Sequence, residues 1–247
     1  MDFGLKDKVA LVTGAGSQIG FGKGISLTLA KEGCNVVITD IDIKGAEQTA
    51  GEVKALGRRA IAFKADITKK VEVDEMVNAA LAEFGRIDIL VNNAGIASPM
   101  GPFINSTEKD WDLDINVNFK GTLYCTKAVL PQMIERKSGK IINISSPAGL
   151  WGVPVSAIYA SAKAAVIIFS KSLAAGLSPS GINVNVVTPF GGFTNFIAAS
   201  KTAPELVKFF EKEESLGHLS TPKDIGFAVT FLASTAANGV TGQVVGA

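Results

Sequence analysis

The sequence is poor in the side chains that most often perform acid/base and metal chemistry. Its 247 residues include one histidine, His218, two cysteines, Cys34 and Cys125, and two tyrosines, Tyr124 and Tyr159. Two cysteines cannot form a disulfide framework, and their apolar surroundings are typical of a reducing cytoplasm. A single histidine with no cysteine or histidine nearby predicts no metal site and disfavours a serine–histidine hydrolase. Proton transfer must therefore depend on another residue type.

The sequence also has almost no net charge and no long apolar runs. The formal net charge is +1, and the basic residues are scattered, so the sequence has no electrostatic footprint for nucleic acid. No run approaches the roughly 18 apolar residues that a membrane helix needs, and the charged residues at 1–8 are unlike a secretory signal. A hydrophobic content of 47% supplies a core and excludes disorder. We expect a globular cytoplasmic protein that binds neither nucleic acid nor a membrane.

Short apolar runs alternate with longer helical patterns along the chain. Strands are expected at residues 9–13, 35–39, 60–63, 87–91, 140–145, 182–187 and 243–245. Helices are expected at about 22–32, 43–56, 70–84, 107–136, 156–178 and 222–234. The alternation predicts a single α/β domain over 1–247, a doubly wound parallel sheet of about seven strands with helices on both faces. Ligands of such a sheet bind beyond the carboxyl ends of its strands.

Residues 188–220 interrupt this alternation. They are rich in phenylalanine, glycine and lysine, and they separate the sixth predicted strand from the next helix. Their length and their position at the carboxyl end of a strand predict a substrate lid. The alternative is an ordinary surface insertion with a helix at about 204–214.

A glycine-rich segment, Thr13 to Gly24, follows the first predicted strand. Glycines let main-chain amides approach a pyrophosphate at the start of a helix. The usual G-x-G-x-x-G fingerprint is incomplete because Ile19 occupies the place of its third glycine. A tight turn has the same composition, but the position between the first strand and the first helix favours a cofactor loop. The expected contacts are Gly14, Ser17, Gln18, Gly20 and Gly22.

Asp40 ends the second predicted strand, twenty residues after Gly20. A carboxylate at this place can accept hydrogen bonds from the adenosine ribose and repels a 2′-phosphate. Asp40 therefore predicts NAD in preference to NADP, although Lys23 and Lys44 are cations not far along the chain. The alternative is an aspartate that only terminates the strand.

Ser145 and Ser146 end the fifth predicted strand, and Tyr159 and Lys163 begin the following helix. Residues four apart share a helical face. A phenol has a pKa of about 10, and a neighbouring ammonium group lowers it by favouring the phenolate. We expect Tyr159 to exchange a proton with a substrate oxygen that Ser146 binds. The pattern also fits a half-buried tyrosine beside a packed lysine; Tyr124 has no lysine at this spacing and is expected to pack.

In this order, the motifs resemble the short-chain dehydrogenase/reductase family over essentially the whole chain. The matching residues are Thr13, Gly14, 20–22, Asp66, Ile67, 92–95, 118–121, Ser146, Tyr159, Lys163, Pro189 and Thr194. The resemblance implies a Rossmann-type sheet and hydride transfer between NAD(P) and a hydroxyl or carbonyl carbon. It also implies a homotetramer, or a homodimer, with the predicted helices 107–136 and 156–178 at an interface.

The resemblance also implies residue roles. Tyr159 would be the acid/base, and Lys163 would bind the nicotinamide ribose and tune Tyr159. Ser146 would orient the substrate oxygen, and Asn118 would support a water-linked proton relay. Further cofactor contacts would be Asp66 and Ile67 at the adenine, Asn92, Asn93, Ala94 and Gly95 beside the ribose, Pro189, and Thr194 at the nicotinamide amide.

The expected substrate pocket includes Ala97, Ser98, residues 147–153 and the lid. Its substrate contacts are expected to be Ser146, Ala148, Trp151, Phe190 and Phe193. Their apolar character favours a hydrophobic or cyclic secondary alcohol or ketone over a polyol, unless the aromatic rings only pack the lid. Phe190 stands where the family commonly has glycine, so the local backbone path must differ.

Two other functions remain open from the sequence. One is a 3-hydroxyacyl thioester dehydrogenase or 3-oxoacyl reductase, which belongs to the same reaction class. The other is a catalytically silent nucleotide-binding subunit of an assembly.

Overall fold

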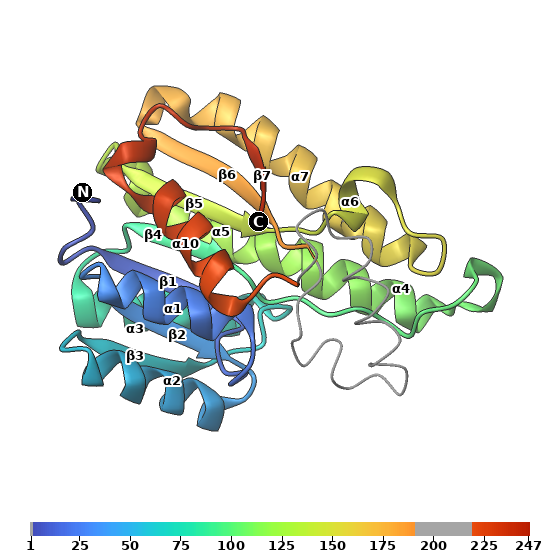
Figure 1. Ribbon diagram of the computed structural model, residues 1–247, viewed down its shortest axis with the longest axis horizontal. Coiled ribbons are helices and arrows are strands. Elements are labelled where there is room, and N and C mark those ends of the chain that lie inside the picture. Colours follow the sequence, from blue (N-terminus) through green and yellow to red (C-terminus); the bar gives the residue numbers. More distant parts are fainter. Residues whose placement is uncertain (1, 191–218) are drawn as a thin grey trace.

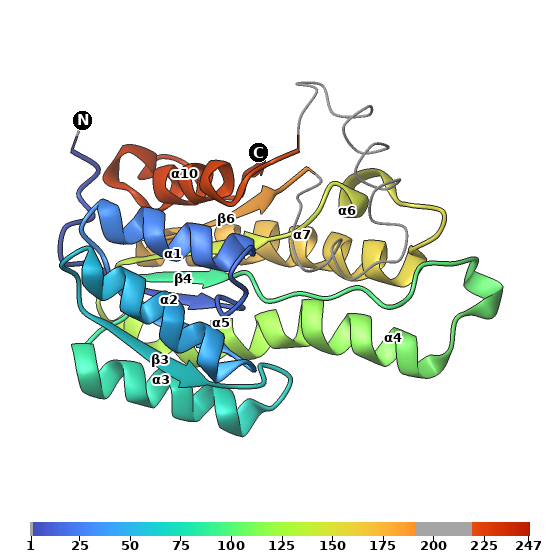
Figure 2. The ribbon, with the colours of Figure 1, turned by 60° about the horizontal axis from the view of Figure 1, so that its bottom comes forward.

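In the computed structural model, which describes residues 2–190 and 219–247, the strands form one sheet (Figures 1 and 2). Its seven strands pair in the order β3-β2-β1-β4-β5-β6-β7, and every neighbouring pair is parallel. Their bounds are β1 Val9–Thr13, β2 Asn35–Asp40, β3 Ala60–Lys64, β4 Ile89–Asn92, β5 Gly139–Ile144, β6 Ile182–Thr188 and β7 Val244–Gly246. The predicted sheet is confirmed. The strand order reverses between β1 and β4, which places a ligand crevice at their carboxyl ends.

Helices cover both faces of the sheet (Figures 1 and 2). Their bounds are α1 Phe21–Lys31, α2 Ile43–Ala55, α3 Lys70–Phe84, α5 Gly121–Glu135, α7 Ala157–Leu177 and α10 Pro222–Ala233. Successive strand residues face opposite cores: Ala10 and Val12 pack with α1, α2 and α10, whereas Val9 and Leu11 pack with α3, α5 and α7. Because both faces are buried, most strand residues are apolar, although β6 includes Asn183 and Asn185.

The predicted helix 107–136 is interrupted in the structure. Helix α4 (Glu108–Ile115) begins with a capping box, in which Thr107 and Asp110 satisfy each other's main-chain N–H groups. A π-helical turn, η2 (Asn116–Lys120), separates α4 from α5. Such turns add a residue to the helical repeat and frequently occur at functional sites. Asn118 lies in this turn.

The sequence did not predict several short elements. These are α6 Ala148–Trp151 and the 3₁₀ turns η1 Phe103–Asn105, η3 Ser178–Ser180 and η4 Thr235–Ala237. Segments of three or four residues are too short to show a helical period. The possible helix at 204–214 and most of the predicted lid, 191–218, lie outside the described residues.

Helix α7 and the turn after it, Ala157–Ser180, are long and apolar enough to cross a membrane by length and composition alone. In the fold, however, α7 packs against β6, α4 and α6, and it carries the buried Lys163. Buried core helices of globular proteins share this composition.

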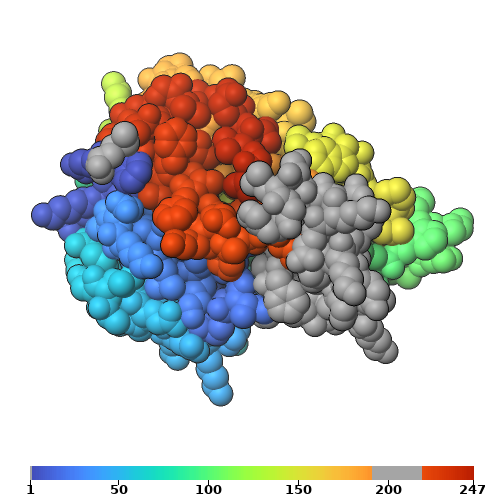
Figure 3. Space-filling view, in the orientation of Figure 1, coloured from blue at the N-terminus to red at the C-terminus, as the bar shows by residue number. Residues whose placement is uncertain are grey.

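Helices α1 and α10 lie side by side because glycines line their contact (Figures 1 and 2). A Cβ atom on Gly24 of α1 would lie 2.3 Å from the carbonyl oxygen of Pro222, and one on Gly226 of α10 would lie 2.3 Å from Thr28 Oγ1. In the space-filling view, the atoms of α10 lie directly against those of α1 (Figure 3). No side chain fits at Gly24 without a backbone shift.

We predict that Gly24→Ala lowers the free energy of unfolding by about 1–3 kcal/mol, because the methyl group meets main-chain atoms. The matched control is Gly51→Ala in α2, where an added Cβ atom would have no neighbour within 4 Å. The control should be stabilising by about 0.5–1 kcal/mol, because alanine favours helix. Urea unfolding of both variants measures the difference, and equal midpoints would contradict the packing argument.

Candidate active site

The glycine loop after β1 touches the segment after β4. Gly14 has a φ of +65°, and a Cβ atom there would lie 2.6 Å from Ala94 Cα. Asn93 Nδ2 donates hydrogen bonds to the carbonyl oxygens of Thr13 (2.8 Å) and Gly14 (2.9 Å). Thr13 Oγ1 in turn accepts hydrogen bonds from the amides of Asn93 and Ala94, each at 3.0 Å. Asn93 and Ala94 therefore brace the loop.

The same loop contains a buried hydroxyl group without a partner. Ser17 Oγ has no hydrogen-bond acceptor or donor among the described residues. Nearby, Gly20 is the N-cap of α1 and supplies no capping side chain, and a Cβ atom on Gly22 would lie 2.3 Å from Gly14 O. Uncapped amides at a helix N-terminus, beside an unsatisfied hydroxyl group, fit the phosphate oxygens of a dinucleotide. The residues present therefore fit NAD(P).

The side chain of Gln18 is bonded within the protein. Its Nε2 donates to the carbonyl oxygens of Gly16 (2.8 Å) and Gly45 (3.1 Å), which fastens the loop to α2. Its Oε1 accepts a hydrogen bond from Lys23, whose ammonium group also pairs with Glu52 at 2.7 Å. The charge of Lys23 is thus compensated locally.

Asp40 lies at the mouth of the glycine loop. Its Oδ2 accepts a hydrogen bond from the Gly16 amide at 2.8 Å, and its Oδ1 accepts one from the Asp42 amide at 3.0 Å. The first contact ties the carboxylate to the loop, and the second is the turn contact that a strand-terminating aspartate makes. Each carboxylate oxygen keeps capacity for a further donor.

Asp66 and Ile67 follow β3 near the same edge of the sheet. Burial raises the pKa of Asp66, but hydrogen bonds from Thr68 and the charge of Lys69 outweigh it, so the net shift is downward. Ile67 is buried, and its Cδ1 lies 2.4 Å from where a Cβ atom on Gly121 would be. The pair thus combines an ionised carboxylate with an apolar side chain packed on α5.

The two serines after β5 make different contacts. Ser145 Oγ donates to the carbonyl oxygen of Lys163 at 2.8 Å and so anchors α7 to the sheet. Ser146 hydrogen-bonds the phenol of Tyr159, and its Oγ also accepts a hydrogen bond from the Ala148 amide at 3.2 Å. Only Ser146 therefore faces the predicted acid/base.

Tyr159 and Lys163 lie together on the buried face of α7. Lys163 Nζ donates to Ile144 O at 3.1 Å and lies 5.7 Å from the centroid of the Tyr159 ring. Burial lowers the pKa of Lys163 to about 8, against the charge of Asp114, which raises it. Burial raises the pKa of Tyr159 to about 12, because the hydrogen bond with Ser146 offsets it only in part. The expectation of a lowered phenol pKa is therefore wrong, because the loss of water sets the direction of the shift.

Gly95 lies between Lys163 and Asn118. A Cβ atom on Gly95 would lie 2.9 Å from Asn118 Oδ1 and 3.1 Å from Lys163 Nζ. Asn118 Nδ2 donates to the carbonyl oxygens of Ile96 (2.7 Å) and Asp114 (2.9 Å), and its Oδ1 accepts from the Ile96 amide (3.2 Å). The Asn118 side chain therefore holds the segment after β4 against the π-helical turn. Ile96 and Asp114 were not predicted from the sequence, in which the only signal for Asp114 is an acidic residue one turn before Asn118.

Some of the predicted substrate contacts lie near one another in the structure. Trp151 is 66% exposed, and its ring lies 6.2 Å from that of Phe190, while Ala148 in the same short helix is buried. Phe190 has no positive φ, and its amide donates to Ala247 O at 2.9 Å, so its path is unstrained. Pro189 beside it is buried. Thr194, Phe193 and His218 lie outside the described residues.

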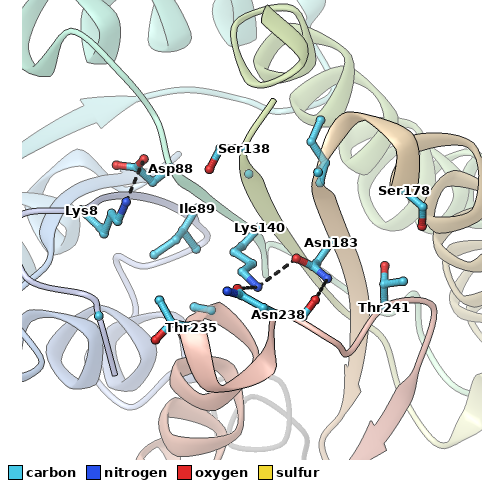
Figure 4. A pocket seen from close by; sticks show the side chains of 15 residues that line it. Lys8, Asp88, Ile89, Ser138, Lys140, Ser178, Asn183, Thr235, Asn238 and Thr241 are labelled. Carbon is cyan, nitrogen blue, oxygen red and sulfur yellow. Dashed lines mark hydrogen bonds and ion pairs between the residues drawn. The ribbon is translucent and has the colours of Figure 1, made fainter. Parts of the chain in front are cut away.

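A separate cavity of about 460 Å³ opens at the amino-terminal edge of the sheet (Figure 4). Lys140 lies in it and donates to the amide oxygens of Asn183 (2.9 Å) and Asn238 (2.8 Å), and Lys8 pairs with Asp88 at 4.0 Å. Burial lowers the pKa of Lys140 to about 8. Since the cofactor loop and Tyr159 lie at the carboxyl edge, this cavity is not the predicted site.

Comparison with known proteins places these features in a family. The model of the short chain dehydrogenases matches residues 8–205. The BbsD subunit of (2S)-[(R)-hydroxy(phenyl)methyl]succinyl-CoA dehydrogenase from Thauera aromatica is 42% identical, covering 98% of this chain and 95% of that protein. FabG of Thermotoga maritima, a 3-oxoacyl-[acyl-carrier-protein] reductase, is 36% identical, covering 98% and 96%.

A solved structure has the same fold. It is a variant of the actinorhodin polyketide ketoreductase with NADPH, with a TM-score of 0.90 and 30% identity over 97% of this chain and 95% of that one. Since the family model and both relatives span most of the sequence, the chain belongs to the short-chain dehydrogenase family of oxidoreductases.

Proposed function

We propose that the protein is an NAD-dependent oxidoreductase that interconverts a secondary alcohol and a ketone, with a hydrophobic or cyclic substrate. The observation that carries the proposal is the convergence of Ser146, Tyr159 and Lys163 at the sheet edge that bears the cofactor loop. Membership of an oxidoreductase family supports the reaction class.

The proposed chemistry assigns one task to each side chain. During oxidation, Ser146 donates a hydrogen bond to the substrate oxygen, and Tyr159 as phenolate accepts the hydroxyl proton. Bound NAD supplies the nicotinamide ring that takes up the hydride from the carbinol carbon. Because burial disfavours the phenolate, positive charge must lie near it, and the ammonium group of Lys163 is proposed to supply this charge. During reduction, the Tyr159 phenol returns the proton to the ketone oxygen.

The cofactor would extend along the carboxyl edge of the sheet. Gly14, Ser17, Gln18, Gly20 and Gly22 would hold its diphosphate, with Gln18 contributing main-chain atoms because its side chain is bonded elsewhere. Further contacts are proposed for Asp40, Asp66, Ile67, Asn93, Ala94, Gly95, Tyr159, Lys163, Pro189 and Thr194. Asn118 is proposed to support proton transfer by holding the wall at Ile96.

NAD is favoured over NADP by the charge at Asp40. Within residues 2–190 and 219–247, no cation forms an ion pair with this carboxylate, and Lys23 pairs with Glu52. A 2′-phosphate would therefore meet an uncompensated negative charge. The ketoreductase neighbour carries NADPH, so NADP remains the alternative.

The relatives favour a second candidate on the same site, a 3-hydroxyacyl thioester dehydrogenase or 3-oxoacyl reductase. The name of BbsD's enzyme specifies a phenyl-bearing acyl-CoA, and that of FabG an acyl group on a carrier protein. An aromatic substrate end would suit Trp151 and Phe190, which meet at the site. A silent nucleotide-binding subunit is disfavoured by the convergence of Ser146, Tyr159 and Lys163.

We also propose that the protein is cytoplasmic and forms a homotetramer, or a homodimer, through the outer faces of α5 and α7. Ile134 of α5 is 44% exposed, and Ile168 of α7 is 62% exposed. Exposed aliphatic side chains on long helices are typical of subunit contacts.

A panel of cyclic alcohols, polyols and 3-hydroxyacyl thioesters, incubated with NAD, tests the function through the absorbance of the reduced cofactor. We expect turnover of cyclic alcohols or thioesters above that of polyols. Tyr159→Phe should lower kcat/KM by about 10²–10⁴-fold, the usual contribution of a general base. The matched control is Tyr124→Phe, which removes the other tyrosine and should keep activity. Full activity of Tyr159→Phe would refute the mechanism, and a preference for polyols would refute the substrate class.

The direction of the Tyr159 pKa shift predicts the pH dependence. Oxidation needs the phenolate, and burial raises the pKa of this group, so alcohol oxidation should accelerate as the pH rises into the alkaline range. Ketone reduction needs the neutral phenol and should instead slow at alkaline pH. Measured pH–rate profiles with the same slope in both directions would contradict this assignment.

Asp40→Asn tests the cofactor preference. Removing the charge should lower the ratio of kcat/KM for NAD over NADP by about 10-fold or more. A 10-fold change corresponds to about 1.4 kcal/mol. Asp42→Asn, an exposed neighbour on the same turn, should leave the ratio unchanged. If Asp40→Asn leaves the ratio unchanged, Asp40 only terminates its strand.

A further inference from the structure

Asp114 is a buried carboxylate beside the active site. It lies in α4, one turn before Asn118, and is 1% exposed. No lysine, arginine or histidine within residues 2–190 and 219–247 forms an ion pair with it. Ionised carboxylates are rarely buried without a cation, because water then no longer stabilises their charge.

The carboxylate is instead held by one residue of the segment after β4. Its Oδ1 accepts a hydrogen bond from the Ser98 amide at 2.8 Å, and its Oδ2 accepts one from Ser98 Oγ at 2.7 Å. Hydrogen bonds to a charged acceptor are about twice as strong as neutral ones. The Ser98 hydroxyl is therefore committed to Asp114.

Asp114 and Asn118 together fix alternate residues of that segment. Asn118 exchanges a pair of hydrogen bonds with the main chain of Ile96, and Asp114 binds Ser98 two residues later. Asn118 Nδ2 also donates to the carbonyl oxygen of Asp114 itself. The segment starts at Gly95, whose backbone lies against Lys163 Nζ. A shift at Ser98 would therefore be transmitted toward the catalytic lysine.

The charge of Asp114 also reaches the catalytic helix. Helix α4 packs against α7 and η2, and the titratable groups facing it from α7 are Tyr159 and Lys163. Asp114 raises the pKa of both groups. Of the remaining acidic residues of α4, Glu108 and Asp112 are exposed, and Asp110 forms the capping box with Thr107.

We propose that Asp114 is a positioning residue of the active site. Its carboxylate binds Ser98 and, together with Asn118, holds the segment 96–98 in place. Its charge faces Tyr159 and Lys163. The proposal rests on the oxidoreductase function proposed above. Loss of the charge destabilises the Lys163 ammonium group and favours the Tyr159 phenolate, so the pKa of each group falls.

The first test needs no substrate. Protein labelled with [¹³Cε]lysine is titrated by NMR, with and without NAD, and the Lys163 signal is assigned by its loss in Lys163→Arg. In Asp114→Asn, we expect Lys163 to titrate below its value of about 8. Asp112→Asn is the matched control, because it removes an exposed charge from the same helix, and it should leave this titration unchanged. An unchanged Lys163 titration in Asp114→Asn would overturn the electrostatic part of the proposal.

The second test separates position from charge. Ser98→Ala keeps the buried charge but removes the hydroxyl contact, so Lys163 should titrate as in the wild type while KM for the substrate rises several-fold. In Asp114→Asn, the acid limb of the kcat/KM profile for alcohol oxidation should move to lower pH; Asp114→Glu, which keeps the charge, should restore it. Wild-type kinetics in Ser98→Ala would overturn the positioning role, even if Asp114→Asn proves too unstable to study.

The two tests also distinguish failure of this proposal from failure of the proposed function. If no alcohol or ketone is turned over, the proposed function is refuted, but the Lys163 titration still tests the role of Asp114. If turnover occurs and Asp114→Asn matches Asp112→Asn in every measurement, the proposed function is supported and the proposed role of Asp114 is refuted.

Discussion

The candidate active site depends on the contact between the backbones that follow β1 and β4. Gly14 can approach Ala94 only because it lacks a side chain, and Asn93 fastens the two segments with its amide group. From this contact, one segment leads to the cofactor loop and α1, and the other leads to Gly95 and Ile96. The same few atoms therefore set the distance between the glycine loop and the group formed by Ser146, Tyr159 and Lys163.

Burial dominates the electrostatics at the catalytic end. It raises the pKa of Tyr159 to about 12 and lowers that of Lys163 to about 8. Both shifts disfavour the charged form of the group, as desolvation requires. The site thus favours a neutral phenol and weakens the hold of the lysine on its proton, whereas the charge of Asp114 raises the pKa of both groups.

Much of this arrangement could be predicted from the sequence, because it is encoded locally. Continuous apolar runs located the strands, and the spacing of Ser146, Tyr159 and Lys163 indicated one catalytic group. The π-helical turn at Asn118 could not be predicted, because α4 before it buries only Asp114 and so has no clear hydrophobic period whose shift would reveal an extra residue.

Other features could not be predicted from the sequence because they depend on contacts between distant residues. The Gln18 side chain binds Gly45 on another element, and Asp114 binds Ser98 in a loop. The pKa of Tyr159 was assigned the wrong direction, because spacing along a helix identifies a neighbouring lysine but not the absence of water.

The hydrogen bond from Ser145 to the carbonyl oxygen of Lys163 has an evolutionary consequence. It fastens α7 to the end of β5 through a side-chain hydroxyl group and a main-chain oxygen, independently of Trp151 and Phe190. Mutations can therefore change the Trp151–Phe190 pair without moving Tyr159 and Lys163. A lineage built on this anchor can acquire new substrates while it inherits the same chemistry.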